Sequence, residues 1–365
     1  MKRMVFEEAV DAAIAEAMVR DERVIVLGLD VPMMRAGLHA RFGPDRVLGA
    51  PISEGAYLGA AVGAAMAGLR PVVEIMMVDF IGVALDALLN HAAKLSGFTH
   101  GRWTNPLVLR MSCGAGYGDG GQHGQALWGM LAGIPGLSVV VPSTPDDAYG
   151  LMTSALAHDG PVVFLEHKLL TKNWLEFVGS GGRTTLSFDV PKAGHEGDVT
   201  KQPVRLGSAA RRRTGDDVTL VSLGVSVHRA LAAAEQLASS GISCEVLDLR
   251  SVRPLDTASI LASVQRTGRL LVVDEDYRDF GLSGEVSAVV AEAGLPVRFA
   301  RVCTEDTIPF ARHLEDAALP NVTRIVTAAQ RLMGAPAQAI TRPLQLTEVA
   351  PGPASAANHQ PRALS

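Results

Sequence analysis

The sequence predicts an α/β protein with two parallel-sheet domains, each a three-layer arrangement with helices on both faces of its sheet. Apolar runs alternate with segments of helical period, first within residues 6–166 and again within 217–332. This alternation is typical of parallel sheets buried on both faces. Between the two blocks, the period is poor and glycine, serine, threonine and charge predominate. We therefore expect domains at 1–175 and 217–335, an interdomain linker at 176–216 and an extended or disordered tail at 336–365.

The elements of the first block follow from the same patterns. Strands are expected where apolar runs meet turn residues, at 23–28, 46–52, 70–76, 106–110, 137–141 and 161–166. Helices are expected at 6–20, from an N-cap at Ser53 to a terminating Gly68, at 80–95 and at 145–157. The second block predicts strands at 217–224, 243–249, 269–274 and 297–302, and helices at 227–239, 257–267, 284–293 and 322–332.

Composition indicates an ordinary globular protein with a core of aliphatic and small side chains. The chain has 365 residues, of which 48% are hydrophobic and 5% aromatic, and a formal net charge of −5. Its short basic run, Arg211 to Arg213, falls in the expected linker, so we expect no nucleic-acid partner. The first segment is an amphipathic helix with acids throughout and no run approaches membrane-spanning length, so we expect a cytoplasmic protein without a membrane partner. Widely spaced cysteines without a CxxC pattern predict core residues rather than disulfides or zinc ligands.

Four features stand out as candidates for chemistry. Glu54 lies in the first turn of a helix of small residues that can pack closely, and on these residues alone a complement to the helix dipole is the favoured interpretation. Asp30 follows a strand at the sheet edge where open α/β sheets bind ligands, although loop acids are more often solvated. The loop from Gly114 to Gly124 is glycine-rich but has neither the Walker lysine nor the Rossmann spacing. His123 lies at the end of this loop, where a titrating imidazole is useful, although a lone histidine is more often structural.

Several longer motifs occur in a fixed order. The first half contains PISEGAYLGAAVGAAMAGLRPVVEI, DFIGVALDALLNHAAK, a loop ending in QHGQ, IPGLSVVVPSTPDDAYGLM and GPVVFLEHK. The second half contains VTLVSLG, VLDLRSVRPLD, GRLLVVDED and TIPF. From about Phe6 to Met333 the chain thus resembles the β subunit of the thiamine-diphosphate-dependent component of 2-oxoacid dehydrogenase complexes, the family of pyruvate, branched-chain and acetoin dehydrogenases. The resemblance implies an N-terminal pyrimidine-binding domain and a C-terminal transketolase-like domain.

The resemblance also implies roles for individual residues. Glu54 matches a glutamate that hydrogen-bonds a pyrimidine nitrogen of thiamine diphosphate, where sharing a proton favours the imino tautomer that acts as an internal base. Phe80 would stack on the pyrimidine and Met76 would line its pocket, whereas without the resemblance both would be ordinary core residues. His123 matches the active-site histidine, which is proposed to steady substrate-derived intermediates and to aid acyl transfer to a lipoyl group.

Part of the site is expected on another chain. Thiamine enzymes generally anchor Mg²⁺ and the diphosphate through GDG and a later asparagine pair. Gly118-Asp119-Gly120 copies only the first part and lies in the histidine's loop, so we interpret it as a coincidence. The resemblance therefore implies an α subunit that holds Mg²⁺, an α2β2 heterotetramer and an active site at the α/β interface.

A structural K⁺ is a further expectation from the resemblance. Family members hold it mainly through backbone carbonyls, at positions that match Leu107, Ala155, Leu156, His158 and Gly160. Here His158 and Gly160 replace the usual Asp and Asn types, a change that carbonyl ligation tolerates.

The main functional hypothesis is oxidative decarboxylation of a 2-oxoacid, or cleavage of acetoin, with transfer of the acyl group to a lipoylated partner. One alternative is a split transketolase-like subunit, which would need more histidines and arginines for sugar phosphates than the first half offers. Another is a non-catalytic scaffold subunit, although such a subunit would have no chemical reason to keep both Glu54 and His123. Leu29 stands where the family typically has an acid, and the following segment, Pro32 to Arg35, is shortened. These departures leave the substrate open.

Overall fold

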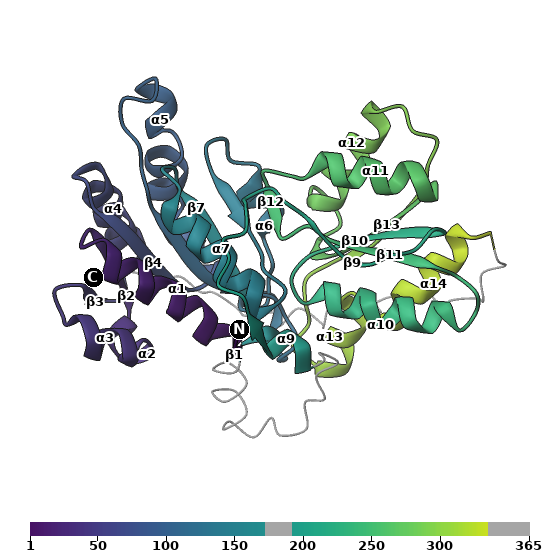
Figure 1. Cartoon of the computed structure of the whole chain (residues 1–365), viewed down its shortest axis with the longest axis horizontal. Coiled ribbons are helices and arrows are strands. Elements are labelled where there is room, and N and C mark those ends of the chain that lie inside the picture. Colours follow the sequence, from purple (N-terminus) through teal and green to yellow (C-terminus); the bar gives the residue numbers. More distant parts are fainter. Residues whose placement is uncertain (172–191, 335–365) are drawn as a thin grey trace, which may run out of the picture.

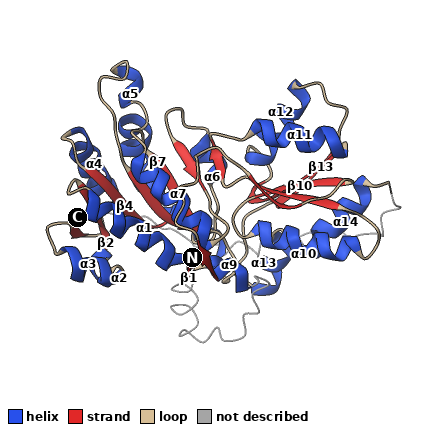
Figure 2. Ribbon diagram, in the orientation of Figure 1, coloured by secondary structure: helices blue, strands red, loops and turns tan. Residues whose placement is uncertain are grey.

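The computed structural model describes residues 1–171 and 192–334. Figures 1 and 2 show two sheets, each flanked by helices. The first sheet has the strand order β12-β6-β7-β5-β4-β2-β3 and the second has the order β14-β13-β10-β11-β9, while β1 and β8 form a separate two-stranded sheet. Within the two large sheets all neighbouring strands are parallel except the edge strands β12 and β9. The predicted α/β class with two parallel-sheet domains is thereby confirmed.

The first domain is built from elements within residues 1–171. Its strands are β1 (Lys2–Val5), β2 (Val24–Leu29), β3 (Val47–Ala50), β4 (Arg70–Met77), β5 (Val108–Cys113), β6 (Ser138–Val140) and β7 (Val162–His167). Its α-helices are α1 (Phe6–Arg20), α2 (Val31–Met34), α3 (Ala36–Phe42), α4 (Glu54–Met66), α5 (Leu95–Phe98), α6 (Trp128–Ala132) and α7 (Pro145–Ala157). It also has 3₁₀ segments η1 (Val78–Ala84), η3 (Gly120–Gln122) and η4 (Lys168–Leu170) and a π-helical segment η2 (Ala87–Ala92).

The remaining elements follow residue 191. The strands are β8 (Glu196–Val199), β9 (Ala210–Arg213), β10 (Val218–Ser222), β11 (Cys244–Asp248), β12 (Ser251–Arg253), β13 (Arg269–Tyr277) and β14 (Arg298–Thr304). The helices are α9 (Lys192–His195), α10 (Ser226–Ala238), α11 (Thr257–Thr267), α12 (Leu282–Glu292), α13 (Arg312–Ala318) and α14 (Val322–Leu332). In the second sheet, α10 and α14 cover one face while α11 and α12 cover the other (Figure 1).

Helices with strong capping signals begin and end where the sequence predicts. The Thr144 hydroxyl accepts the amide of Asp147 at the start of α7, and the Asp256 carboxylate accepts the amide of Ser259 at the start of α11. Gly268 ends α11 in the left-handed conformation, at φ 64°. The predicted bounds of α1, α7, α11 and α14 are confirmed, and each predicted strand is present with ends that differ by a few residues.

The predicted helix at 80–95 is confirmed as helical over residues 80–92, but it is not a regular α-helix and it breaks at 93–94. The segment instead passes through η1, η2 and α5, and in η2 the Ala93 amide donates to the carbonyl of Leu88, five residues earlier. The segment packs directly on α4, where a Cβ on Gly55 would lie 2.8 Å from the Val83 carbonyl oxygen. Its backbone therefore follows the surface of α4 instead of a regular α-helical path.

Ser53 occupies the predicted N-cap position of α4 but does not cap the helix with its side chain. Its hydroxyl donates to the carbonyl of Pro51, at 3.3 Å. At the other end, Gly68 has φ 100° and its amide donates to the carbonyl of Ala65, so the predicted stop is confirmed.

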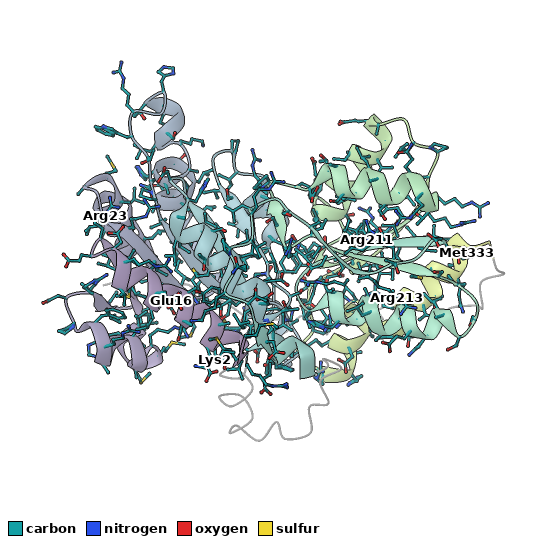
Figure 3. The ribbon with its side chains drawn as sticks, in the orientation of Figure 1. Lys2, Glu16, Arg23, Arg211, Arg213 and Met333 are labelled. Atoms are coloured by element: carbon teal, nitrogen blue, oxygen red, sulfur yellow. The ribbon has the colours of Figure 1, made fainter. Side chains whose placement is uncertain are left out.

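The predicted linker at 176–216 contains regular structure. Residues 172–191 lie outside the described residues, but the rest of the segment includes α9, β8 and β9. Strand β8 pairs with β1 and β9 pairs with β11, so Arg211 and Arg213 lie on an edge strand of the second sheet (Figure 3). The expectation of an irregular linker is therefore wrong for this part, because its short polar strands are fixed by distant partners. The exact domain boundaries stay predictions, and the expected tail at 336–365 lies outside the described residues.

The two domains share a strand and an apolar core. Strand β12 follows β11 of the second sheet, yet it pairs antiparallel with β6 of the first. One buried cluster contains residues from both domains, among them Leu131, Val139, Leu249 and Leu282. The interface between the domains is therefore continuous with the hydrophobic core.

Polar contacts reinforce this interface. The Arg212 guanidinium of β9 pairs with Asp147 of α7 and with Asp248 of β11. His228 Nε2 of α10 lies 2.7 Å from the Ser143 carbonyl oxygen. The basic run that begins at Arg211 thus contributes an arginine to an ion pair between the domains.

A buried ion cluster crosses the first sheet. Arg110 of β5 pairs through Nη1 with Asp11 (2.9 Å) and Glu74 (3.2 Å), and through Nη2 with Glu166 (3.1 Å). Arg35 adds a bidentate pair with Glu74 at 3.0 Å to both oxygens. Burial alone would raise the pKa of Glu74, but the two guanidinium groups outweigh it and lower that pKa. The shortened segment after β2 therefore supplies a structural cation.

No helix in the described part of the chain combines the length and the apolar character that crossing a bilayer requires.

We expect Arg110→Met to lower the free energy of unfolding by about 3–5 kcal/mol, because it leaves the carboxylates of Glu74 and Glu166 buried with too little positive charge. Urea unfolding at neutral pH measures this effect. Arg23→Met, which removes an exposed pair with Asp21, should change little. Equal effects of the two substitutions would contradict the assigned importance of the buried cluster.

Candidate functional site

The carboxyl ends of β4 and β5 bring two predicted site residues into contact. Strand β4 leads into η1, which carries Phe80, and β5 leads into Gly114–Gly124, here called the histidine loop, which carries His123. The two strands are parallel neighbours, so both segments leave the sheet at one edge. The rings of Phe80 and His123 meet edge to face, with centroids 5.7 Å apart and an interplanar angle of 88°.

Met76 lies on the same strand at an irregular position. The register between β4 and β5 shifts between Ile75 and Met77, so Met76 falls within the irregularity. It is half-buried, whereas its two neighbours are buried. Such irregularities re-aim side chains beside functional sites, which suits a pocket-lining role.

Glu54 opens α4 and has a half-buried side chain. In the parts of the chain that the structure describes, its carboxylate has no hydrogen-bond or ion-pair partner. Its charge still acts locally: burial raises the pKa of the Tyr57 phenol, and the charges of Glu54 and Glu74 raise it further. Gly55, the next residue, contacts the backbone of η1 three residues after Phe80. Glu54 and Phe80 therefore border one junction between α4 and η1.

Sequence reasoning missed a polar chain beside Phe80. Asp79 Oδ1 accepts both the backbone amide (3.2 Å) and the side-chain amide (2.9 Å) of Gln125. Gln125 Oε1 in turn accepts the hydroxyl of Tyr277 from the second domain, at 3.1 Å. Asp79 Oδ2 is buried without a partner among the described residues. A carboxylate within an apolar segment at the sheet edge was the signal that could have identified Asp79.

The GDG tripeptide has internal partners. Asp119 pairs with the Nζ of Lys168 at 3.3 Å, and the same Nζ donates to the carbonyl of His123. The Lys168 side chain is fully buried beneath the histidine loop. This use of Asp119 agrees with the interpretation that GDG here is a coincidence.

Two of the five predicted K⁺ positions, Leu156 and His158, contact Arg70. The Arg70 guanidinium donates to the carbonyls of Leu156 (3.1 Å) and His158 (2.7 Å). The Leu107 carbonyl accepts the amide of Val162, and the Ala155 carbonyl accepts the amide of His158. Gly160 lies against the His158 imidazole, since a Cβ there would be 3.1 Å from Nε2. A carbonyl oxygen that accepts one hydrogen bond keeps a second lone pair, with which it can still bind a cation. The binding of K⁺ at these positions stays a prediction.

Asp30 has an exposed side chain and a left-handed backbone at φ 54°. Its carbonyl accepts the amides of Met33 and Met34 in α2. A ligand-binding role for Asp30 stays a prediction.

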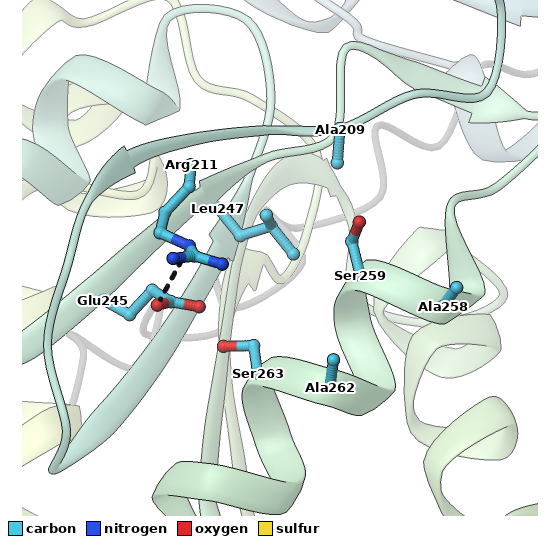
Figure 4. A pocket seen from close by; sticks show the side chains of 8 residues that line it. All are labelled: Ala209, Arg211, Glu245, Leu247, Ala258, Ser259, Ala262 and Ser263. Carbon is cyan, nitrogen blue, oxygen red and sulfur yellow. Dashed lines mark ion pairs between the residues drawn. The ribbon is translucent and has the colours of Figure 1, made fainter.

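A pocket of about 360 Å³ opens in the second domain between β9, β11 and α11 (Figure 4). It is lined by Ala209, Arg211, Glu245, Leu247, Ala258, Ser259, Ala262 and Ser263. Its two charged lining residues, Arg211 and Glu245, pair with each other at 3.3 Å. It contains none of the predicted site residues. Within residues 1–171 and 192–334, no three His, Cys, Asp or Glu side chains group so that they could hold a metal ion.

Comparison with known proteins decides the family. The models "Transketolase, pyrimidine binding domain" and "Transketolase, C-terminal domain" match residues 2–173 and 207–325. The β subunit of acetoin:2,6-dichlorophenolindophenol oxidoreductase from Cupriavidus necator is 38% identical over 352 residues, which cover 91% of this chain and 98% of the relative. The chain belongs to this dehydrogenase β-subunit family. The predicted resemblance is thereby confirmed.

Other members of the dehydrogenase β-subunit family are similar over comparable lengths. The pyruvate dehydrogenase subunit beta-1 of Arabidopsis thaliana is 39% identical, with 90% of this chain and 89% of the relative covered. The 2-oxoisovalerate dehydrogenase subunit beta of Bacillus subtilis is 34% identical, with 91% and 99% covered. A solved split-gene transketolase, an inactive beta4 tetramer, matches with a TM-score of 0.74 at 21% identity and covers 91% of this chain and 98% of its own. That match shows the fold alone.

Helix α6, which follows the histidine loop, meets two buried acids of β13. Trp128 Nε1 donates to Asp274 Oδ1 at 2.9 Å, and the Gly129 amide donates to Asp276 Oδ2 at 2.6 Å. Asp274 Oδ2 has no partner among the described residues. Burial, followed by the charge of Asp276, raises the pKa of Asp274 to about 8.

We expect Asp274→Asn to remove a pH dependence of stability. Because this pKa lies above the ordinary value of about 3.9, the folded state holds a proton that the unfolded chain has released. Stability should therefore fall in the wild type as pH rises from about 4 to 8, by at most about 1.4 kcal/mol per pH unit. The amide keeps an acceptor for Trp128, so the variant should lack this slope in urea unfolding across that window. Asp279→Asn, at an exposed site, is the control; a constant difference between wild type and Asp274→Asn at all pH values would refute the raised pKa.

Proposed function

We propose that this chain is the β subunit of a thiamine-diphosphate-dependent dehydrogenase. It acts with an α subunit on a 2-oxoacid or on acetoin, by oxidative decarboxylation or cleavage, and passes the acyl group to a lipoylated partner. The observation that carries this proposal is the Glu54 carboxylate, which has no partner among the described residues and borders the junction of α4 with η1, the segment whose Phe80 ring meets His123. The names of the relatives, which act on pyruvate, acetoin or 2-oxoisovalerate, support this reaction class. They favour it over the split transketolase-like and scaffold alternatives.

The residues present fit the pyrimidine end of the cofactor. When bound, thiamine diphosphate supplies a carbon nucleophile for carbonyl substrates. Glu54 would share a proton with a pyrimidine nitrogen, a role that suits a half-buried carboxylate with no competing partner in the described chain. Phe80 would offer its ring for stacking, and Met76 would line the pocket. His123, oriented by Phe80, would hold or move a proton during acyl transfer.

The other half of the site is assigned to the α subunit. The names of the relatives as β subunits imply such a partner. Asp119, the acid of the GDG tripeptide, is already paired with Lys168. We therefore assign Mg²⁺ and the diphosphate to the α chain in an α2β2 assembly. The lipoylated partner, K⁺ and cytoplasmic location stay predictions.

Turnover with a candidate α subunit tests the function. The co-purified complex should reduce an artificial electron acceptor in a thiamine-diphosphate-dependent manner with pyruvate, with branched-chain 2-oxoacids or with acetoin. Binding of the cofactor without turnover on any of these would favour the transketolase-like alternative. A failure to bind the cofactor would favour the scaffold alternative.

Glu54→Gln should leave the complex assembled but lower turnover by orders of magnitude, because an amide cannot share the proton. Steady-state kinetics measures the loss, with circular dichroism as a check on folding. The matched control is Glu285→Gln, which changes an exposed first-turn glutamate of α12 and should leave turnover unchanged. Near-normal activity of folded Glu54→Gln would sink the assigned mechanism.

His123→Ala should reduce acylation of a free lipoyl domain more than reduction of the artificial acceptor. The imidazole is assigned to the transfer step, whereas the acceptor bypasses that step. His91→Ala, at an exposed histidine, is the control. Equal losses in both assays would count against the role of His123.

A further inference from the structure

Carboxylates of the second domain hold the first part of the histidine loop. The amide of Ala115 donates to Glu275 Oε1 at 2.9 Å. The amides of Gly116 and Gly118 donate to the two oxygens of Glu315, at 2.9 and 2.8 Å. Three amides within four residues thus bind acids that lie far away in the sequence.

The loop conformation explains why glycines are needed. Gly116 and Gly118 have φ values of 121° and 71°, in the left-handed region that side chains rarely adopt. Backbone amides that converge in this way form a concave anion site. Here the anion is the carboxylate of Glu315, so the glycine-rich loop binds an acid of its own chain.

Both acids are fully buried and have cationic or polar partners. Glu315 pairs with Arg312 at 2.9 Å. Glu275 accepts His167 Nε2 at 2.8 Å and Arg229 Nη1 at 2.6 Å. The Leu169 amide donates to His167 Nδ1, which leaves Nε2–H as the donor to Glu275. Hydrogen bonds to ionised carboxylates are among the strong ones in proteins.

Glu275 remains an acceptor at neutral pH. Burial alone would raise its pKa, but interactions with His167 and Arg229 and the hydrogen bonds that it accepts lower this pKa to about 2.

The middle of the loop also lies against the second domain. A Cβ on Gly120 would lie 2.7 Å from the Phe310 ring, and one on Gly121 would lie 3.0 Å from Thr307. From the first domain, Lys168 donates to the carbonyl of His123. The backbone that carries His123 is therefore fixed between both domains.

We propose that Glu315 and Glu275 are positioning residues, through which the second domain holds the histidine loop so that His123 faces the reacting groups. This role rests on the proposed function of the site. A glycine-rich loop loses much conformational entropy on ordering. Without the carboxylates, the loop amides would donate their hydrogen bonds to water instead. The His123 imidazole would then lose its fixed position beside Phe80.

The test compares Glu315→Gln and Glu315→Asp with Asp316→Asn, a neighbouring exposed acid of α13 that pairs with Arg312 but not with the loop. Amide hydrogen exchange of the full chain and of its complex with the α subunit reports on the loop itself. In Glu315→Gln an N–H₂ group replaces one acceptor, so exchange at Gly116 and Gly118 should rise about tenfold or more. Asp316→Asn should leave it unchanged, and Glu315→Asp should restore part of the protection.

Kinetics separates positioning from general stability. Glu315→Gln should lower kcat for lipoyl acylation with little change in the KM for the 2-oxoacid or acetoin, and should spare reduction of the artificial acceptor, as in His123→Ala. Glu315→Asp should recover part of that kcat. Equal losses in both assays would show a merely structural role and overturn the proposal.

Exchange decides the proposal independently of turnover. If the wild-type amides of Gly116 and Gly118 exchange as fast as those of an unstructured peptide, the carboxylates do not fix the loop and the proposal is wrong. This measurement needs only the wild type, so it applies even if Glu315→Gln fails to fold. If the complex shows no turnover with any tested substrate, the proposed function fails. A loss of exchange protection at Gly116 and Gly118 in Glu315→Gln would still show that Glu315 fixes the loop. Unchanged exchange in both Glu315 variants would overturn it.

Discussion

The contact of Glu275 with the first domain is the constraint on which the site depends. A fully buried carboxylate is costly unless each oxygen has strong partners. Glu275 has three: the His167 imidazole and the Ala115 amide from the first domain, and Arg229 from its own. Because these bonds require one arrangement of the two domains, the carboxyl end of β13 fixes where the histidine loop lies.

The glycines of the histidine loop allow its backbone to pack closely against both domains. A Cβ on Gly114 would lie 2.0 Å from His167, and one on Gly120 would meet the Phe310 ring. The loop can therefore lie directly on His167 of the first domain and Phe310 of the second only because it lacks side chains at these points. Its glycines serve backbone packing and carboxylate binding, which explains why the loop resembles a phosphate-binding segment without having its lysine.

The site divides its tasks between the domains. The residues with assigned chemistry, Glu54, Phe80 and His123, all come from the first domain and lie at the carboxyl edge of its sheet. The second domain contributes acids and the Tyr277 hydroxyl, which contact the backbone or the Gln125 side chain beside His123. Family membership accounts for the first set, whereas the second is recognised only from the contacts.

The sequence by itself determined the α/β class and the helices with capping signals, and its motifs predicted Glu54, Met76, Phe80 and His123 as site residues. Periodicity and caps are local properties, and the motifs are contiguous, so a single chain reveals them. Only the tertiary structure decided the pairing of β8, β9 and β12, the interrupted helix after Phe80 and the use of Asp79 and Glu315. These features depend on partners far away in the sequence. A buried acid or a short polar strand is stabilised by its tertiary contacts, which leave no pattern in the local sequence.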